Sequence, residues 1–289
     1  MIGTDEWEAR GRTIEVPEGR VYLCERGPAD DPCPVLLLHG FPTSSWDFAL
    51  LMEIVSQRRR VVPFDFLGFG LSSKPDDHGY SIFEHADVTQ AVVRATGITR
   101  AHVLAHDLGT SVATELCARR ERGLLPFELA SLVLMNGSVH IELAHLTVGQ
   151  RLLRSPLGSL FARLSSQRTF AAQMRRIFAR PPTDAELDGM WQLLSRADGT
   201  LRLPETIRYV DDRWRFHRRW IGALERLDLP TLVAWAERDP VAVTAIANAL
   251  EREIPGAQRV RWPELGHYPQ VEDPQQVATS VEAFWDRVG

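Results

Sequence analysis

The stretch Val103-Leu104-Ala105-His106-Asp107-Leu108-Gly109 places a carboxylate where an apolar run meets a turn built of small residues. Small residues two positions before and two positions after a nucleophile let the chain turn sharply from a strand into a helix, which exposes the nucleophilic side chain. Ala105 and Gly109 hold these small positions, and Asp107 stands where the G-x-S-x-G pattern carries serine. The stretch therefore predicts a nucleophile elbow with Asp107 at its tip.

A carboxylate at this position changes the chemistry that the turn can support. It is ionised at neutral pH and needs no base to attack, but it attacks ester and amide carbonyls poorly and suits displacement at a saturated carbon. One alternative is that Asp107 only caps the helix that begins near Gly109. A serine-type esterase is a weaker alternative, because the nearest downstream serine, Ser111, is expected inside that helix.

The composition is that of an ordinary globular protein. The chain has 289 residues, of which 44% are hydrophobic and 25% charged, so it can bury a sizeable core. A net charge of -5 gives no general attraction to nucleic acid or to anionic membranes, so the expected partners are a small-molecule substrate and water. The polar residues 1–10 show no secretory signal, which favours a cytoplasmic protein. The oligomeric state is left open.

Apolar strands and amphipathic helices alternate along most of the chain. Two short strands at 13–16 and 21–24 are expected to pair antiparallel across a turn. Further apolar strands are expected at 35–38, 61–66, 101–105, 129–135, 231–235 and 258–262, with helices between them. The pattern predicts an α/β fold with a mostly parallel sheet covered by helices on both faces.

Residues 138–226 interrupt this alternation. They are rich in Arg and Trp and predict helices with no convincing strand, and the strand-helix pattern returns after them. The expected organisation is therefore one core domain formed by residues 1–137 and 227–289, with a helical cap insertion at residues 138–226.

A nucleophile at an elbow needs a base and an acid that orients the base, and in this type of fold they follow in the order nucleophile, acid, base. Asp239 lies just beyond a predicted strand, and His267 lies in a glycine-containing loop beyond the next strand. The expected oxyanion hole consists of the backbone N–H groups of Leu108 and Phe41. The sequence thus predicts the catalytic triad Asp107, Asp239 and His267.

Other side chains are candidates for the walls of the pocket or for ligands. The aromatic residues that could wall the pocket are Trp46, Trp214 and Trp220, together with His106, which is also a candidate for packing beside the elbow. No metal or cofactor is expected, because the histidines outside the triad show no convincing ligand spacing; they include His78, His85, His102, His140 and His145. The three cysteines predict buried free thiols; they are Cys24, Cys33 and Cys117.

Several motifs in order resemble the epoxide hydrolase and haloalkane dehalogenase branch of the α/β-hydrolase superfamily. They cover nearly the whole chain and are His39–Trp46, Asp65–Gly70, Tyr80–Glu84, His106–Gly109, Asn136-Gly137, Arg218–Leu224 and Gly266–Pro269. The resemblance implies an eight-stranded sheet, a helical cap over the site and an Asp-His-Asp triad. For these residues we expect a two-step reaction, in which Asp107 forms an alkyl-enzyme ester and His267 activates the water that hydrolyses it.

The chain departs from both patterns of that branch. Dehalogenases usually hold the halide with a Trp after the nucleophile and a second Trp or an Asn after the His-Gly turn, but here Leu108 and Phe41 occupy these positions. Epoxide hydrolases usually use two cap tyrosines as acids, and Tyr209 is the one tyrosine within residues 138–226. The favoured reaction is hydrolysis of small or medium apolar epoxides. Haloalkane dehalogenation is the alternative, with Trp191, Trp214 or Trp220 as halide donor.

A role without catalysis is a further alternative, because fold alone does not determine function. The run Arg213-Trp214-Arg215-Phe216-His217-Arg218-Arg219 alternates basic and aromatic side chains, which suits an acidic partner. The favoured interpretation of this run is a solvated helix face with the Trp and Phe buried.

Overall fold

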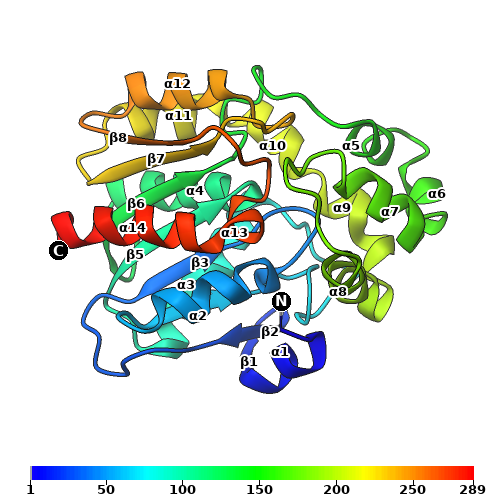
Figure 1. Ribbon diagram of the computed structural model, residues 1–289, viewed down its shortest axis with the longest axis horizontal. Helices are drawn as coiled ribbons and strands as arrows, with labels where there is room; N and C mark the ends of the chain where they lie inside the picture. The colour runs from blue at the N-terminus through cyan, green and yellow to red at the C-terminus, as the bar shows by residue number, and fades with distance from the viewer. Residues whose placement is uncertain (1) are drawn as a thin grey trace.

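An eight-stranded sheet forms the centre of the molecule (Figure 1). The structure is a computed structural model and describes residues 2–289. The strand order is β1-β2-β4-β3-β5-β6-β7-β8. The strands are β1 (Gly11–Val16), β2 (Gly19–Cys24), β3 (Val35–Leu38), β4 (Val61–Phe64), β5 (Arg100–His106), β6 (Glu128–Met135), β7 (Thr231–Ala236) and β8 (Gln258–Trp262).

The sheet is antiparallel at one edge and parallel elsewhere. β1 pairs antiparallel with β2, β2 pairs antiparallel with β4, and the remaining neighbours pair parallel. The central strands β3 and β5 are buried almost along their whole length, as expected of parallel strands covered on both faces. The predicted α/β fold with a mostly parallel eight-stranded sheet is confirmed.

Helices cover both faces of the sheet (Figure 1). One face carries α2 (Ala49–Val55) and α14 (Pro274–Val288), which pack on each other. The other carries α3 (Ile82–Thr96), α4 (Leu108–Glu121), α11 (His217–Glu225) and α12 (Thr244–Glu253). Short elements complete the core and are α1 (Thr4–Arg10), the 3-10 helix η1 (Ser45–Phe48) and α13 (Pro269–Glu272).

The insertion, residues 138–226, contains helices between β6 and β7 and has no strand among its residues, as predicted. Apart from α11, these helices lie to one side of the sheet (Figure 1). They are α5 (Val148–Leu153), α6 (Gly158–Arg163), α7 (Gln167–Met174), α8 (Asp184–Ser195), the 3-10 helix η2 (Arg196–Arg202), α9 (Leu203–Thr206) and α10 (Tyr209–Arg215). Helix α11 instead packs along α4 beside the sheet.

Three further findings bear on the sequence predictions. Helix α1 was not predicted; it buries Trp7 against Tyr22 of β2. All three cysteines are free and buried, so the prediction of buried thiols is confirmed. None of the helices formed by residues 2–289 is both long enough and apolar enough to span a membrane.

Candidate active site

The loop between β5 and α4 has the geometry of a nucleophile elbow. Asp107 adopts φ 44° and ψ -109°, a backbone conformation that is strained for a residue with a side chain. The turn requires small neighbours: a Cβ at Gly109 would lie 2.3 Å from the carbonyl oxygen of Leu38, and one at Gly40 would lie 2.8 Å from the Asp107 Cβ. The Asp107 side chain makes no hydrogen bond that caps α4. The alternative in which it serves as a helix cap is therefore wrong.

The two oxygens of the Asp107 carboxylate have different surroundings. Oδ2 accepts a hydrogen bond of 2.9 Å from the backbone N–H of Phe41. Oδ1 lies 3.9 Å from Nη2 of Arg213. The N–H of Leu108 is at the start of α4, and within residues 2–289 it has no hydrogen-bond partner. The two backbone groups predicted as an oxyanion hole thus lie beside the carboxylate, and one of them already contacts it.

His267 and Asp239 form a buried hydrogen-bonded pair. His267 Nδ1 lies 2.7 Å from Asp239 Oδ2, and Asp239 Oδ1 accepts the backbone N–H groups of Val241 and Ala242 at 2.7 and 3.0 Å. Burial alone would lower the pKa of His267, but the charge and hydrogen bond of Asp239 outweigh burial and raise it. Burial would likewise raise the pKa of Asp239, and His267 and further hydrogen bonds lower it overall. Asp239 is therefore ionised at neutral pH and orients the imidazole.

Asn136 is a site residue to which sequence reasoning assigned no role. It follows β6 with φ 43°, and its Nδ2 donates to Asp239 Oδ2 at 2.9 Å. Its Oδ1 accepts the backbone N–H of Ala236, also at 2.9 Å. The Asn-Gly pair after a buried strand was the available signal, because Asn tolerates positive φ.

His106 positions the loop that carries His267. It is buried, which lowers its pKa to about 4, so the ring is neutral at neutral pH. Its Nε2 donates to the backbone oxygen of His267 at 2.7 Å, and its Nδ1 accepts from Gln270 Nε2 at 3.2 Å. Its predicted place beside the elbow is confirmed, but it is not among the residues that line the cavity.

A cavity of about 390 Å³ lies between the sheet and the insertion. From the core it is lined by Phe41, Pro42, Val241 and His267. From the insertion it is lined mainly by apolar side chains, with a few polar ones; they include Leu152, Leu153, Phe161, Phe170, Met174, Ile177, Trp191, Leu194 and Leu203 together with Thr147, Gln150 and Gln173. This lining suits a small or medium, mainly apolar molecule.

Three tryptophans predicted as pocket wall lie elsewhere. Trp46 is buried beneath α8, and its Nε1 donates to a backbone carbonyl near the N terminus. Trp220 is buried in α11, and its Nε1 donates to Glu115 at 2.9 Å. Trp214 is 56% exposed on the surface. The prediction is wrong for all three, because their packing is set by the neighbouring helices, whereas Trp191 does line the cavity.

Tyr209, the predicted acid, is fully buried at the start of α10. Its ring centroid lies 5.7 Å from that of Phe41, and its hydroxyl lies 3.5 Å from Nε2 of Gln150. Both neighbours line the cavity. Burial raises the pKa of the phenol above its usual value of 10, so the hydroxyl retains its proton at neutral pH.

Arg213 is the site residue that the sequence interpretation placed wrongly. Its side chain is 1% exposed; Nε donates to Ser111 Oγ at 2.7 Å, and Nη2 donates to the carbonyl of Asp107 at 3.1 Å. The guanidinium carbon lies 4.4 Å from the ring centroid of Tyr209. The prediction of a solvated helix face with a buried Trp is therefore wrong at the start of the run 213–219, where Arg213 is buried and Trp214 is exposed.

Arg219, in the same run, is also not a free surface charge. Its Nε and Nη2 contact the buried carboxylate of Glu115 at 2.7 and 2.9 Å. Glu115 accepts from Arg119 as well, at 2.9 Å. The hydrogen bonds of Glu115 therefore fix α11 against α4.

Comparison with known proteins gives consistent similarities. A family model described as alpha/beta hydrolase fold matches residues 34–274. The chain is 46% identical to LipZ of Mycobacterium tuberculosis over 280 residues, which cover 96% of each chain. It is 33% identical to the mesoderm-specific transcript protein of Mus musculus over 289 residues, covering 96% of this chain and 86% of that protein.

A solved structure agrees with the architecture. The haloalkane dehalogenase DbeA from Bradyrhizobium elkani superposes with a TM-score of 0.82, covering 96% of this chain and 98% of that one. The two sequences are 23% identical, so this likeness bears on the fold alone. The family model and the sequence relatives confirm the resemblance to the α/β-hydrolase superfamily predicted from the motifs.

Proposed function

Because the chain belongs to the alpha/beta hydrolase fold family, we propose that it is a hydrolase in which Asp107 is the nucleophile and a covalent alkyl-enzyme ester is the intermediate. The substrate we propose is a small or medium apolar epoxide. The observation that supports this most directly is the elbow carboxylate, whose Oδ2 accepts a hydrogen bond from the N–H of Phe41, a residue that lines the largely apolar cavity together with His267. In this proposal the insertion acts as a cap that closes the cavity.

In the first step, Asp107 Oδ1 attacks a ring carbon of the epoxide and the carbon–oxygen bond of the ring breaks. Tyr209 donates its proton to the ring oxygen, so the product is a neutral hydroxyalkyl ester. The buried, protonated phenol beside Phe41 supports this role.

In the second step, His267 takes a proton from water, and the hydroxide attacks the carbonyl carbon of the ester. The N–H groups of Phe41 and Leu108 stabilise the oxyanion that forms. The tetrahedral intermediate then expels the diol oxygen, which receives the proton from His267. This leaves Asp107 as a carboxylic acid and Tyr209 as a phenolate, and transfer of one proton from Asp107 to Tyr209 through solvent restores both groups. Asp239 holds the imidazolium that forms between these events.

The position of Ser111 favours Asp107, rather than a serine, as the nucleophile. It lies inside α4, and its hydroxyl oxygen accepts a hydrogen bond from Arg213. We assign Arg213 a positioning role, because it bridges the elbow carbonyl and the face of Tyr209.

One observation favours haloalkane dehalogenation as the second candidate. Trp191 lines the cavity, and an indole N–H there could stabilise a departing halide. Trp46 and Trp220 are poorer candidates, because their Nε1 atoms already donate hydrogen bonds.

Intact-mass measurement of the His267→Gln variant tests the proposal. Without the base, the ester should form but not hydrolyse. The variant is incubated with a panel of terminal epoxides, chloroalkanes and bromoalkanes, and the expected result is an adduct with the mass of a whole epoxide. Asp107→Asn in the same background should abolish the adduct, and Tyr209→Phe should slow its formation from epoxides but not from haloalkanes.

Other outcomes are equally informative. An alkyl adduct without halogen would transfer the assignment to dehalogenation. If the folded variant forms no adduct across the panel, the proposed reaction is wrong and a role without this catalysis gains support.

A further inference from the structure

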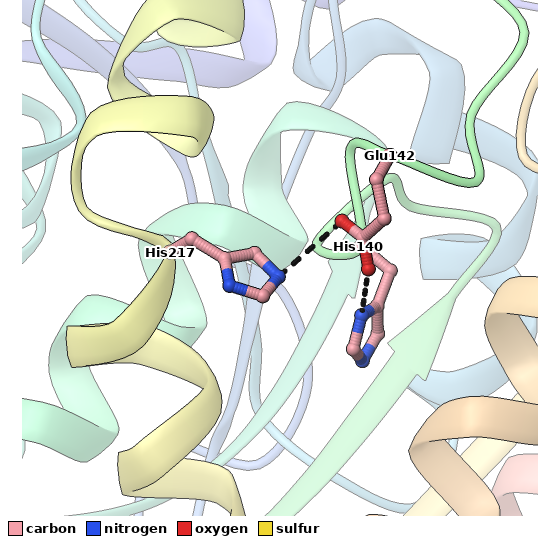
Figure 2. Close-up of side chains that lie close together, drawn as sticks. All are labelled: His140, Glu142 and His217. Carbon is pink, nitrogen blue, oxygen red and sulfur yellow. Dashed lines mark hydrogen bonds and ion pairs between the residues drawn. The ribbon is translucent and has the colours of Figure 1, made fainter.

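Three side chains with metal-binding atoms meet on the side of the molecule where the insertion joins the core (Figure 2). His140 and Glu142 lie in the segment that follows β6, and His217 is the first residue of α11. One candidate ligand atom from each lies within 4.8 Å of the other two. The group is separate from the active-site cavity, because none of the three residues lines it.

His140 lies between two carboxylates. Its Nδ1 is 2.7 Å from Glu142 Oε1, and its Nε2 is 2.7 Å from Glu253 Oε2 at the end of α12. A neutral imidazole has one N–H and can donate to only one of them. At 2.7 Å the other contact is a hydrogen bond only if the ring carries a second proton. A metal ion on one nitrogen would remove the need for that second proton. A carboxylate on the far nitrogen is also the usual means of orienting a metal-binding histidine.

His217 faces the same carboxylate from another side. Figure 2 shows the Glu142 carboxylate between the two imidazole rings, with one oxygen directed to each. His217 Nε2 is 3.3 Å from Glu142 Oε2, yet this shielded nitrogen has no hydrogen-bond partner in residues 2–289. A shielded polar atom without a partner calls for an explanation, and a metal ion would supply the missing interaction.

We propose that His140 Nδ1, Glu142 and His217 Nε2 bind a divalent transition-metal ion of the Zn²⁺ class. Two histidines, one glutamate and a water form a common four-coordinate zinc site. Bonds of about 2.0–2.2 Å in tetrahedral geometry separate ligand atoms by roughly 3.3–3.6 Å, close to the His217–Glu142 separation of 3.3 Å. The His140–Glu142 contact of 2.7 Å is shorter, so the Glu142 side chain must move away from His140 to admit the ion. The metal takes the place of the proton beside Nδ1, and Glu253 keeps the proton on Nε2. This proposal replaces the expectation from sequence that no metal binds.

The surroundings of the site give a bound ion a structural consequence. The side chains of Glu142 and His217 are 38% and 33% exposed and that of His140 is 5% exposed, so the site lies just beneath the surface, with the ligating Nε2 of His217 itself shielded. The ligands come from the start of the insertion and from its last helix, and Glu253 belongs to the core. A bound ion therefore ties both ends of the insertion to α12.

Titration of chelator-treated protein with Zn²⁺, followed by calorimetry, tests the site, with Co²⁺ absorption as an independent report of the ligand geometry. One ion per chain is expected for the unmodified protein. His217→Gln and Glu142→Gln should each weaken binding at least about tenfold, and Glu253→Gln should weaken it about 10- to 100-fold through the orientation of His140. His145→Gln removes an exposed histidine of the same segment and should leave binding unchanged.

Thermal unfolding with and without Zn²⁺ provides a second readout. The midpoint of the unmodified protein should rise with Zn²⁺, and that of His217→Gln, whose substituted side chain is partly exposed, should not. If Zn²⁺ does not bind, or binds the folded His217→Gln and Glu142→Gln variants as tightly as the unmodified protein, the proposal is overturned.

Discussion

Replacing Arg213 by Met tests whether the buried guanidinium supports the elbow. Met fills a similar volume but removes the hydrogen bonds to Ser111 and to the Asp107 carbonyl, as well as the contact with Tyr209. The Asp107 carbonyl loses little, because the N–H and hydroxyl of Thr110 also donate to it, at 3.1 and 2.6 Å. The Ser111 hydroxyl loses its charged donor.

The magnitude follows from these contacts. A hydrogen bond from a charged donor contributes about 1.5–3 kcal/mol, and a desolvated cation–π contact adds up to about 2 kcal/mol. Part of the stability lost with these contacts is recovered, because folding of the variant no longer removes a guanidinium from water. We expect Arg213→Met to lower the free energy of unfolding by about 2–3 kcal/mol.

Urea unfolding measures this change, and Arg215→Met is the matched control. Arg215, two positions further along α10, is exposed and should cost less than about 0.5 kcal/mol. In the His267→Gln background, Arg213→Met should also slow formation of the ester, because the elbow and Tyr209 lose a common partner. Equal unfolding free energies for the two Met variants would refute the reasoning. A more stable Arg213→Met protein would mean that the cost of burying the charge exceeds the gain from its contacts.

Two further predictions concern charge. Hydrolysis of the ester needs neutral His267, and Asp239 outweighs burial and raises the pKa of His267 above its usual 6.5. The single-turnover rate of hydrolysis should therefore rise with pH, with a midpoint above 6.5. A midpoint below 6.5 would contradict the assignment. Glu115→Gln leaves two arginines and a tryptophan without their shared carboxylate, so it should lower the free energy of unfolding in urea by about 2–3 kcal/mol. Glu121→Gln, in an exposed ion pair, should lower it far less. Similar losses for both variants would show that burial of Glu115 adds nothing.

The residues that sequence reasoning located correctly lie where local pattern and topology suffice. Asp107, Asp239 and His267 each follow a strand of the parallel sheet, and the carboxyl ends of such strands meet at one edge. Glycine at 40 and 109 indicated the close approaches that the structure contains. These signals need no knowledge of side-chain packing.

The residues that were placed wrongly depend on packing between distant helices. Arg213 and Trp214 are adjacent, and helix rotation alone decides which is buried; α10 buries the arginine, because the elbow carbonyl and Ser111 offer acceptors. The residues around His140 escaped detection because their partners His217 and Glu253 are remote in sequence. No local spacing reports such a meeting.

The unequal environments of the two Asp107 oxygens have a consequence for isotope exchange. Oδ2 is anchored by the Phe41 N–H, and Oδ1 is the atom that would enter the product in the proposed reaction. If the carboxyl group does not rotate between turnovers, the oxygen taken from water always occupies the Oδ1 position and leaves with the next product. Over many turnovers in ¹⁸O-water, the enzyme would then exchange one carboxylate oxygen of Asp107 repeatedly and retain the other. The unlabelled oxygen that remains would be Oδ2, the one bonded to the Phe41 N–H.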